Sequence, residues 1–223
     1  MRAGIFGGTF NPIHNGHLMV ARKVLRHFNL DRLYLIPCRQ PPHKSPAFLA
    51  PAEHRLQMIR LAIAHDDERL MVSDIETRRE GPSYTIDTID QMAGRLGGGG
   101  DLFLVMGLDA FLELHTWKHQ RRIRSAVQLV VVTRRLDDEH APYASMDRMN
   151  DYIHGHLTPD YAFDAIHASW HSTGLGRAIH LLSTDPVDVS SSQVRQRIKA
   201  GLAIAGLVPA AVCTYIEKKE LYR

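Results

Sequence analysis

The stretch Arg2-Ala3-Gly4-Ile5-Phe6-Gly7-Gly8-Thr9-Phe10-Asn11-Pro12-Ile13-His14-Asn15-Gly16-His17 decides the fold of this 223-residue chain. Its first five residues are rich in apolar side chains and are stopped by two glycines, as expected for a buried strand that enters a turn. Beyond it, apolar residues recur every three or four positions, which indicates an amphipathic helix. These positions are Leu18, Ala21, Val24, Leu25 and Phe28. A second strand at 33–37 completes a βαβ unit.

The rest of the chain continues the alternation of strands and helices. Strands are predicted at 70–75, 102–106, 127–133 and 179–182, and helices at 51–63, 84–96 and 192–200. This alternation favours an α/β fold with a doubly wound, Rossmann-like parallel sheet. The polar segment at about 136–178 departs from it and is predicted to be a small, mostly helical insertion with a helix near 146–156. We expect one domain, 1–223, with a C-terminal helical part at about 190–223.

Composition excludes several classes of protein. With 44% hydrophobic residues the chain can bury a full core, and a net charge of +3 with interspersed signs supports nucleic-acid binding only weakly. Cys38 and Cys213 are far apart, so neither a disulfide framework nor a thiolate metal site is expected. The histidines of the insertion lack an acidic or cysteine signature and are not predicted to bind metal. No apolar run reaches membrane-spanning length and no signal segment is seen, so a cytoplasmic location is expected.

The opening loop carries residues that favour phosphate chemistry. A strand, a glycine-rich turn and a helix start bring backbone N–H groups and the positive end of the helix dipole together, which makes an anion site. Gly7 and Gly8 allow the backbone to approach a phosphate closely. In the HxGH tetrapeptide, His17 falls on the first helical turn and His14 precedes it, so both imidazoles can face one phosphate, and Gly16 keeps the space open. An ordinary glycine turn with polar cap residues does not explain why these features coincide.

The loop resembles the GTFDPxHxGH signature of the nucleotidyltransferase superfamily that shares HxGH with class I aminoacyl-tRNA synthetases. A narrower resemblance, to the bacterial nicotinate-nucleotide adenylyltransferases, rests on further motifs in the family's order over nearly the whole chain. These motifs are Pro41-Pro42-His43-Lys44, Gly81-Pro82-Ser83-Tyr84-Thr85, Gly107-Leu108-Asp109, Trp117, Thr133-Arg134-Arg135, Val189-Ser190-Ser191-Ser192-Gln193-Val194-Arg195 and Glu220-Leu221-Tyr222-Arg223.

The resemblance implies a reaction of NAD biosynthesis, in which ATP and nicotinate mononucleotide give deamido-NAD and pyrophosphate, with Mg²⁺ carried by ATP and no metal ligands in the protein. In-line attack of one phosphate on another needs positioning and charge neutralisation rather than a protein nucleophile. His14 and His17 would donate to the α-phosphate, and Lys44 and Arg195 would contact the leaving phosphates. The wider set of ATP and phosphate contacts would be Gly7, Gly8, Thr9, Phe10, Gly16, Gly107, Asp109, Arg134, Ser190, Ser191 and Ser192.

The resemblance also implies how the pyridine ring is recognised. The ring would stack on Trp117, and its carboxylate would accept hydrogen bonds from the Thr85 hydroxyl and from backbone N–H groups, including that of Lys118. Taken alone, Trp117 fits a partly buried anchor equally well. Asp109 would accept from ribose hydroxyls, although an isolated Asp there is also a good helix cap, and the three serines suit an N-cap cluster as well as a phosphate site.

Three positions depart from the family pattern. Asn11 stands where Asp is frequent, which removes a charge but keeps a turn-forming side chain. Ser192 replaces a frequent Thr and preserves the hydroxyl. Leu136-Asp137 replaces the usual Pro-Gly after Arg134-Arg135, so an adenine contact by Arg134 depends on a loop of altered sequence.

Other functions stay open. Another transferase of the superfamily would act on nicotinamide mononucleotide, phosphopantetheine or a polyol phosphate. A non-catalytic nucleotide-binding regulator is disfavoured by the intact HxGH tetrapeptide, Lys44 and Arg195. An RNA-binding role lacks a basic, aromatic-interleaved stretch. The expected partners are therefore ATP and the mononucleotide, without nucleic acid or membrane, and the sequence leaves the oligomeric state open.

Overall fold

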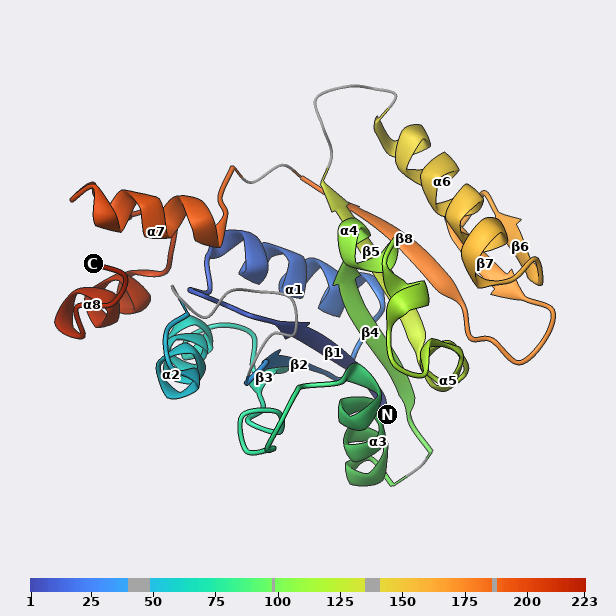
Figure 1. The fold of residues 1–223 in the computed structure, drawn as a ribbon, viewed down its shortest axis with the longest axis horizontal. Coiled ribbons are helices and arrows are strands. Elements are labelled where there is room, and N and C mark those ends of the chain that lie inside the picture. The colour runs from blue at the N-terminus through green and yellow to red at the C-terminus, as the bar shows by residue number, and fades with distance from the viewer. Residues whose placement is uncertain (40–48, 98, 135–140, 186–187) are drawn as a thin grey trace. The chain divides into compact units, whose positions relative to one another are not determined.

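A computed structural model describes residues 1–39, 49–97, 99–134, 141–185 and 188–223 of the chain (Figure 1). Within these residues the strands form a sheet in the order β3-β2-β1-β4-β5-β8-β7-β6. The predicted α/β fold is confirmed, and the sheet is largely parallel but mixed. Over the same residues, no helix combines the length and the apolar character that a membrane crossing requires.

The boundaries of the elements follow the sequence order. The strands are β1 (Arg2–Gly8), β2 (Arg32–Pro37), β3 (Leu70–Val72), β4 (Asp101–Gly107), β5 (Gln128–Arg134), β6 (Tyr161–Asp164), β7 (Ser169–Ser172) and β8 (Ile179–Thr184). The helices are α1 (Asn15–His27), α2 (Ala52–Ile63), α3 (Thr85–Arg95), α4 (Leu108–Phe111), η2 (Leu114–Thr116), α5 (Gln120–Ala126), α6 (Ala141–Tyr152), η3 (Ile153–Leu157), α7 (Ser191–Lys199) and α8 (Ala210–Lys218).

The chain divides into two compact units. The first unit comprises Met1–Ile5, Asn29–Asp31 and Tyr84–Pro186, and the second unit comprises Phe6–Phe28, Arg32–Ser83 and Val187–Arg223.

The second unit contains the predicted first helix and second strand. Helix α1 buries the predicted apolar stripe through Leu18, Ala21, Val24 and Leu25, and β2 pairs in parallel with β3. Helix α2 starts after Pro51, as predicted, because a proline needs no helical hydrogen-bond acceptor for its nitrogen at this place. The strand predicted at 70–75 is shorter, ending at residue 72.

The first unit contains three parallel strands whose apolar side chains are buried. Strand β5 pairs in parallel with β4 and with β8, so that Val131 lies between Met106 and Leu181. All three side chains are at most 8% exposed. The predicted strands at 102–106, 127–133 and 179–182 are confirmed to within two residues at each end.

The edge of the first unit holds two strands that the sequence pattern did not indicate. Strands β6 and β7 pair antiparallel, and β7 pairs antiparallel with β8. Both lie within the segment expected to be a mostly helical insertion, and Figure 1 shows α6 alongside them. Each is four residues long, which is too short for a clear alternating pattern. Helix α6 begins five residues before the helix expected at 146–156, and the short π-helix η3 follows it.

Candidate active site

The loop after β1 has a left-handed residue and a cis peptide bond. Phe10 has a φ of 46° and the Asn11–Pro12 peptide bond is cis. The Phe10 side chain is 2% exposed and contacts Phe6 and His17 edge-on, with ring centroids 5.6 and 5.0 Å apart. Burial of the Phe10 ring therefore offsets the cost of its left-handed backbone.

The two histidines of the HxGH tetrapeptide lie stacked at the start of α1. Their ring centroids are 3.6 Å apart, with 25° between the ring planes. His14 is the N-cap residue of α1, and its backbone N–H donates to Nδ1 of His17 across 3.3 Å. Because Nδ1 of His17 accepts this hydrogen bond, the neutral ring carries its proton on Nε2. The fold thus fixes one tautomer of His17, which has a donor on its far side.

Gly16 is required by close packing. A Cβ atom added there would lie 3.1 Å from Nδ1 of His14 and 3.2 Å from Cγ1 of Val189. The space that a side chain at position 16 would need is therefore filled by the His14 ring. Gly8 is similarly tight, since an added Cβ would lie 3.0 Å from the Phe10 ring, whereas Gly7 faces open space. An open Gly7 is compatible with close approach of a phosphate.

Arg195 joins helix α7 to the loop. Its Nη1 donates to the backbone oxygen of Asn11 at 2.8 Å, and its Nη2 donates to Oγ of Ser192 at 3.2 Å. A guanidinium has five N–H donors, so these two bonds orient the group without using up its donors. The structure therefore brings the Arg195 cation to the same loop as His14 and His17.

The three serines at the start of α7 have different partners. Ser190 is the N-cap and accepts from the Gln193 N–H at 3.1 Å, which is the capping role expected from its sequence. Ser191 donates to the Pro12 carbonyl oxygen at 2.9 Å, and Ser192 accepts from Arg195. The cluster thus fixes α7 against the loop, and a contact of these hydroxyls with phosphate stays a prediction.

Two residues that sequence reasoning did not assign to the site also hold the loop. The Arg55 side chain is fully buried on α2 and donates to the carbonyl oxygens of Thr9, Ala50 and Arg39, at 2.8, 2.9 and 3.0 Å. Tyr222, near the C-terminus, donates to Oδ1 of Asn11 at 2.8 Å. In the sequence, the signal that could have indicated a buried role for Arg55 is its place on the same helix face as the apolar residues Ile59 and Ile63.

The Asn11 side chain connects three segments of the second unit. Its Oδ1 accepts from Tyr222 and from the Ala50 N–H at 3.0 Å. A neutral amide oxygen serves both donors, so the Asp of the family pattern is not needed for the geometry of the turn. Burial raises the pKa of Tyr222, while Arg55 and Arg195 oppose that rise. The Tyr222 hydroxyl therefore remains a neutral donor over the physiological pH range.

The residues predicted to recognise the pyridine ring lie in the first unit. Thr85 is the first residue of α3 and is half-buried. Trp117 follows η2 and is also half-buried, and its backbone N–H donates to the Leu114 carbonyl oxygen at 3.0 Å. Lys118 places Nζ 4.3 Å from the centroid of the Tyr84 ring, a cation–π contact. The first unit thus holds all three residues predicted to meet the nicotinate group.

Other predicted contacts are only partly described. Gly107 ends β4 and is the N-cap of α4, so Asp109 lies exposed in the first turn and does not cap the helix. Arg134 ends β5, but its side chain lies outside the described residues, as does all of Lys44. Within the described residues, no group of three His, Cys, Asp or Glu side chains could hold a metal ion.

Comparison with known families gives the class of protein. Residues 5–197 match the model of the cytidylyltransferase-like family, so the chain belongs to this family.

Full-length relatives narrow the class further. A protein of Desulfatibacillum aliphaticivorans named probable nicotinate-nucleotide adenylyltransferase is 38% identical over 229 residues, which cover 100% of both chains. A protein of Geobacter metallireducens with the same name is 37% identical over 223 residues, covering 100% of this chain and 98% of the relative.

A solved structure of Plasmodium falciparum nicotinic acid mononucleotide adenylyltransferase, complexed with NaAD, has the same fold. The TM-score is 0.70 at 17% identity, over 99% of this chain and 97% of the other.

Proposed function

We propose that this protein transfers the adenylyl group of ATP to nicotinate mononucleotide, giving deamido-NAD and pyrophosphate. The observation that carries the proposal is the stacked pair His14 and His17 at the start of α1, with the tautomer of His17 fixed by a backbone N–H. The names of the full-length relatives support the substrate.

The chemistry at the histidines is charge stabilisation. A phosphate oxygen of the mononucleotide attacks the α-phosphorus of ATP in line, the new P–O bond forms, and the bond to the pyrophosphate breaks. No covalent intermediate with the enzyme is formed. Negative charge grows on the α-phosphate oxygens during this step, and N–H donors held in place beforehand stabilise it without reorganisation. Nε2 of His17 is such a donor, and the buried His14 ring supports it from one side.

Cations neutralise the leaving pyrophosphate. Arg195 fits this role because its two hydrogen bonds to the protein aim the guanidinium at the loop. Lys44 is proposed from its motif. Mg²⁺ bound to the triphosphate would supply further positive charge. The imidazoles, hydroxyls and guanidinium of the second unit suit phosphate oxygens rather than Mg²⁺, which prefers carboxylate and water oxygens, so we propose that ATP carries the metal.

Recognition of the acid is assigned to the first unit. A pyridine ring stacked on Trp117 would bury part of its face, and its carboxylate would accept hydrogen bonds from the Thr85 hydroxyl and the Lys118 N–H. Asp109 and Gly107 are proposed to meet the ribose or the nucleotide, and Arg134 the adenine. These residues of the first unit would discriminate between acid and amide, since an amide cannot replace a carboxylate as a charged acceptor.

The test compares the acid and amide mononucleotides with ATP and Mg²⁺, measuring kcat/KM for each. Each charge-assisted hydrogen bond lost to the amide costs roughly 1.5 to 3 kcal/mol, so the acid is expected to react faster by orders of magnitude. Equal rates would contradict the nicotinate assignment and favour the nicotinamide nucleotide. Turnover of phosphopantetheine instead would move the chain to another branch of the superfamily, and no turnover at all would favour a regulator.

A further inference from the structure

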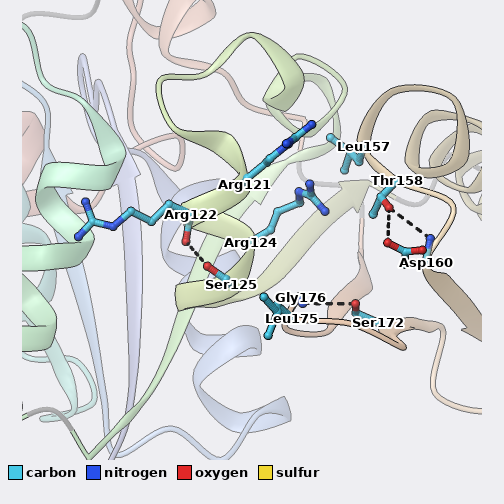
Figure 2. A pocket seen from close by; sticks show the side chains of 10 residues that line it. All are labelled: Arg121, Arg122, Arg124, Ser125, Leu157, Thr158, Asp160, Ser172, Leu175 and Gly176. Carbon is cyan, nitrogen blue, oxygen red and sulfur yellow. Dashed lines mark hydrogen bonds between the residues drawn. The ribbon is translucent and has the colours of Figure 1, made fainter.

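A pocket of about 640 Å³ lies in the first unit, lined by α5, the end of η3 and the loop between β7 and β8 (Figure 2). None of its lining residues belongs to the candidate active site. Its volume falls within the range of roughly 300 to 1,000 Å³ that is usual for small-molecule sites. The pocket is therefore large enough for a ligand of its own.

Three arginines of α5 line the pocket, but they are not equivalent. Figure 2 shows Arg121 and Arg124 extending toward Leu157 and Thr158, while Arg122 extends the opposite way. Nη2 of Arg122 pairs with Asp90 at 2.9 Å. Within the part of the chain that the structure describes, neither Arg121 nor Arg124 has a carboxylate partner. Two guanidinium charges thus face the pocket without neutralisation by a bonded carboxylate.

Arg124 gives the stronger argument for a bound anion, because it is only 7% exposed. Its Nε donates to Oε1 of Gln120 at 3.0 Å, and its other neighbour is the Tyr161 hydroxyl, which itself donates to the Arg177 carbonyl oxygen at 3.0 Å. Burial raises the pKa of Tyr161, and Arg124 only partly opposes that rise, so the hydroxyl stays neutral. Both partners are uncharged. A buried cation that has only neutral partners is costly, and an anion from solution would lower that cost.

The remaining lining residues suit the rest of such a ligand. Asp160 is a carboxylate at the pocket; its Oδ2 accepts from the Thr158 hydroxyl at 2.7 Å, and its single negative charge is outnumbered by the charges of Arg121 and Arg124. Ser172 Oγ accepts from the Gly174 and Gly176 N–H groups, which leaves its O–H free to donate to an anion. Two leucines, at 157 and 175, add apolar surface, and the second is 94% exposed.

We propose that this arginine pocket is a second binding site, for an organic phosphate whose phosphate group is held by Arg121 and Arg124 and whose apolar part lies on the two leucines. Guanidinium groups bind phosphate with two parallel hydrogen bonds, so a pair of them favours a dianion. The apolar surface favours an organic phosphate over free inorganic phosphate.

Helix α5 connects this pocket to Trp117. The Gln120 side chain accepts from Arg124, and the Gln120 backbone N–H donates to the Trp117 carbonyl oxygen at 3.2 Å. An anion that draws Arg124 toward itself weakens the bond to Gln120 beside Trp117. Occupancy of the pocket is therefore expected to change the KM for the mononucleotide. This consequence rests on the proposed role of Trp117, whereas the binding site itself does not.

The site is tested by calorimetric titration of the full chain with phenyl phosphate, inorganic phosphate and phenol. Phenyl phosphate is expected to bind most tightly, because it alone has both the dianion and the ring. Each substitution removes one charge-assisted contact, so Arg121→Gln and Arg124→Gln should each weaken the binding of phenyl phosphate at least about tenfold. Arg122→Gln, on the same helix turn but paired with Asp90, is the matched control and should bind normally.

Because Arg124 is buried, its replacement risks unfolding, so the exposed Arg121 is the deciding variant. Unchanged affinity in Arg121→Gln, or no binding of phenyl phosphate to the wild type at millimolar concentration, would overturn the site. So would binding that is lost in Arg195→Gln instead, since it would move the ligand to the reaction loop. Binding with an unchanged KM for the mononucleotide would overturn the connection to Trp117. The acid and amide comparison tests the proposed function independently.

Discussion

The loop Gly7–His17 and the segment Tyr84–His119 differ in how their key side chains are engaged. In the loop and the helix that meets it, Asn11, His17 and Arg195 have hydrogen bonds to protein atoms. In the other segment, the structure gives the side chains of Thr85 and Trp117 no hydrogen bond or ring contact with any described residue. His17 and Arg195 are thus oriented by hydrogen bonds to the protein, whereas the side chains of Thr85 and Trp117 have no such bonds among the described residues.

This difference separates two demands on an adenylyl transferase. Groups that stabilise a transition state work best when they are already oriented, because reorganisation during the reaction costs free energy. Groups that recognise a substrate must keep their hydrogen-bonding capacity for it. The comparison predicts that substitutions near the loop lower kcat, and that substitutions at Thr85 or Trp117 raise KM.

The largest effect is expected for His17→Ala. Removing a donor that acts in the transition state should lower kcat at least about a hundredfold, while affinity for the mononucleotide changes little. Steady-state kinetics and a binding titration measure the two quantities. His27→Ala, at the exposed end of the same helix, is the control. A near-normal kcat in His17→Ala would remove this residue from the reaction.

Gly16→Ala should act next most strongly. Its Cβ would lie 3.1 Å from the His14 ring, so the ring must move by a few tenths of an ångström. Small misplacements of reacting groups are costly, and kcat is expected to fall on the order of 30-fold without loss of the fold. Gly94→Ala, in helix α3 where an added Cβ meets nothing within 4 Å, is the control. Equal kcat in both variants would show that the position of the His14 ring does not affect the rate of the reaction.

Trp117→Ala tests the other side of the comparison. Loss of a stacking platform is worth roughly 1 to 3 kcal/mol, so KM for the mononucleotide should rise about tenfold or more while KM for ATP is little changed. Trp117→Phe keeps an aromatic face and should recover most of the affinity. An unchanged KM in Trp117→Ala would argue against stacking.

Tyr222→Phe should have a smaller effect. It removes the hydrogen bond to Asn11 but keeps the ring, so the free energy of unfolding should fall by about 0.5 to 1.5 kcal/mol, and kcat should fall a few-fold. Tyr215→Phe removes a similar hydrogen bond, 2.8 Å long, to His54 and is the matched control. If both variants lose stability but neither loses kcat, Tyr222 has no positioning role.

The smallest effect is expected for Asp66→Asn. Asp66 forms an ion pair with Arg22 of α1. A hydrogen bond from Arg22 lowers the pKa of Asp66, so the ion pair stabilises the folded state above the unfolded pKa of about 3.9. That stabilisation is lost as the pH falls through the lower, folded pKa. Arg22 is 43% exposed, so screening limits the contribution to at most about 1 kcal/mol. Thermal unfolding should show a difference from wild type at pH 7 that disappears in acid, with kcat unchanged.

Prediction from sequence succeeded where the signal is local. The apolar stripe of α1, the proline start of α2 and the Ser190 cap of α7 each depend on neighbouring residues, and all three are confirmed. The strands β6 and β7 were missed, because such short strands gain their stability from pairing with a neighbour, β6 with β7 and β7 with β8, rather than from their own pattern.

For the site, the sequence by itself indicated which residues are candidates for phosphate chemistry, because HxGH, the glycines and Arg195 lie in recognisable motifs. Only the tertiary structure decided how they are held. The Arg55 side chain lies under the loop, Tyr222 reaches Asn11 from 211 positions away, and α5 turns Arg122 away from its neighbours. The first two contacts join residues that are remote in sequence, and the third feature is the direction in which one side chain of a helix extends. No local pattern encodes them, because packing of the whole chain sets their geometry.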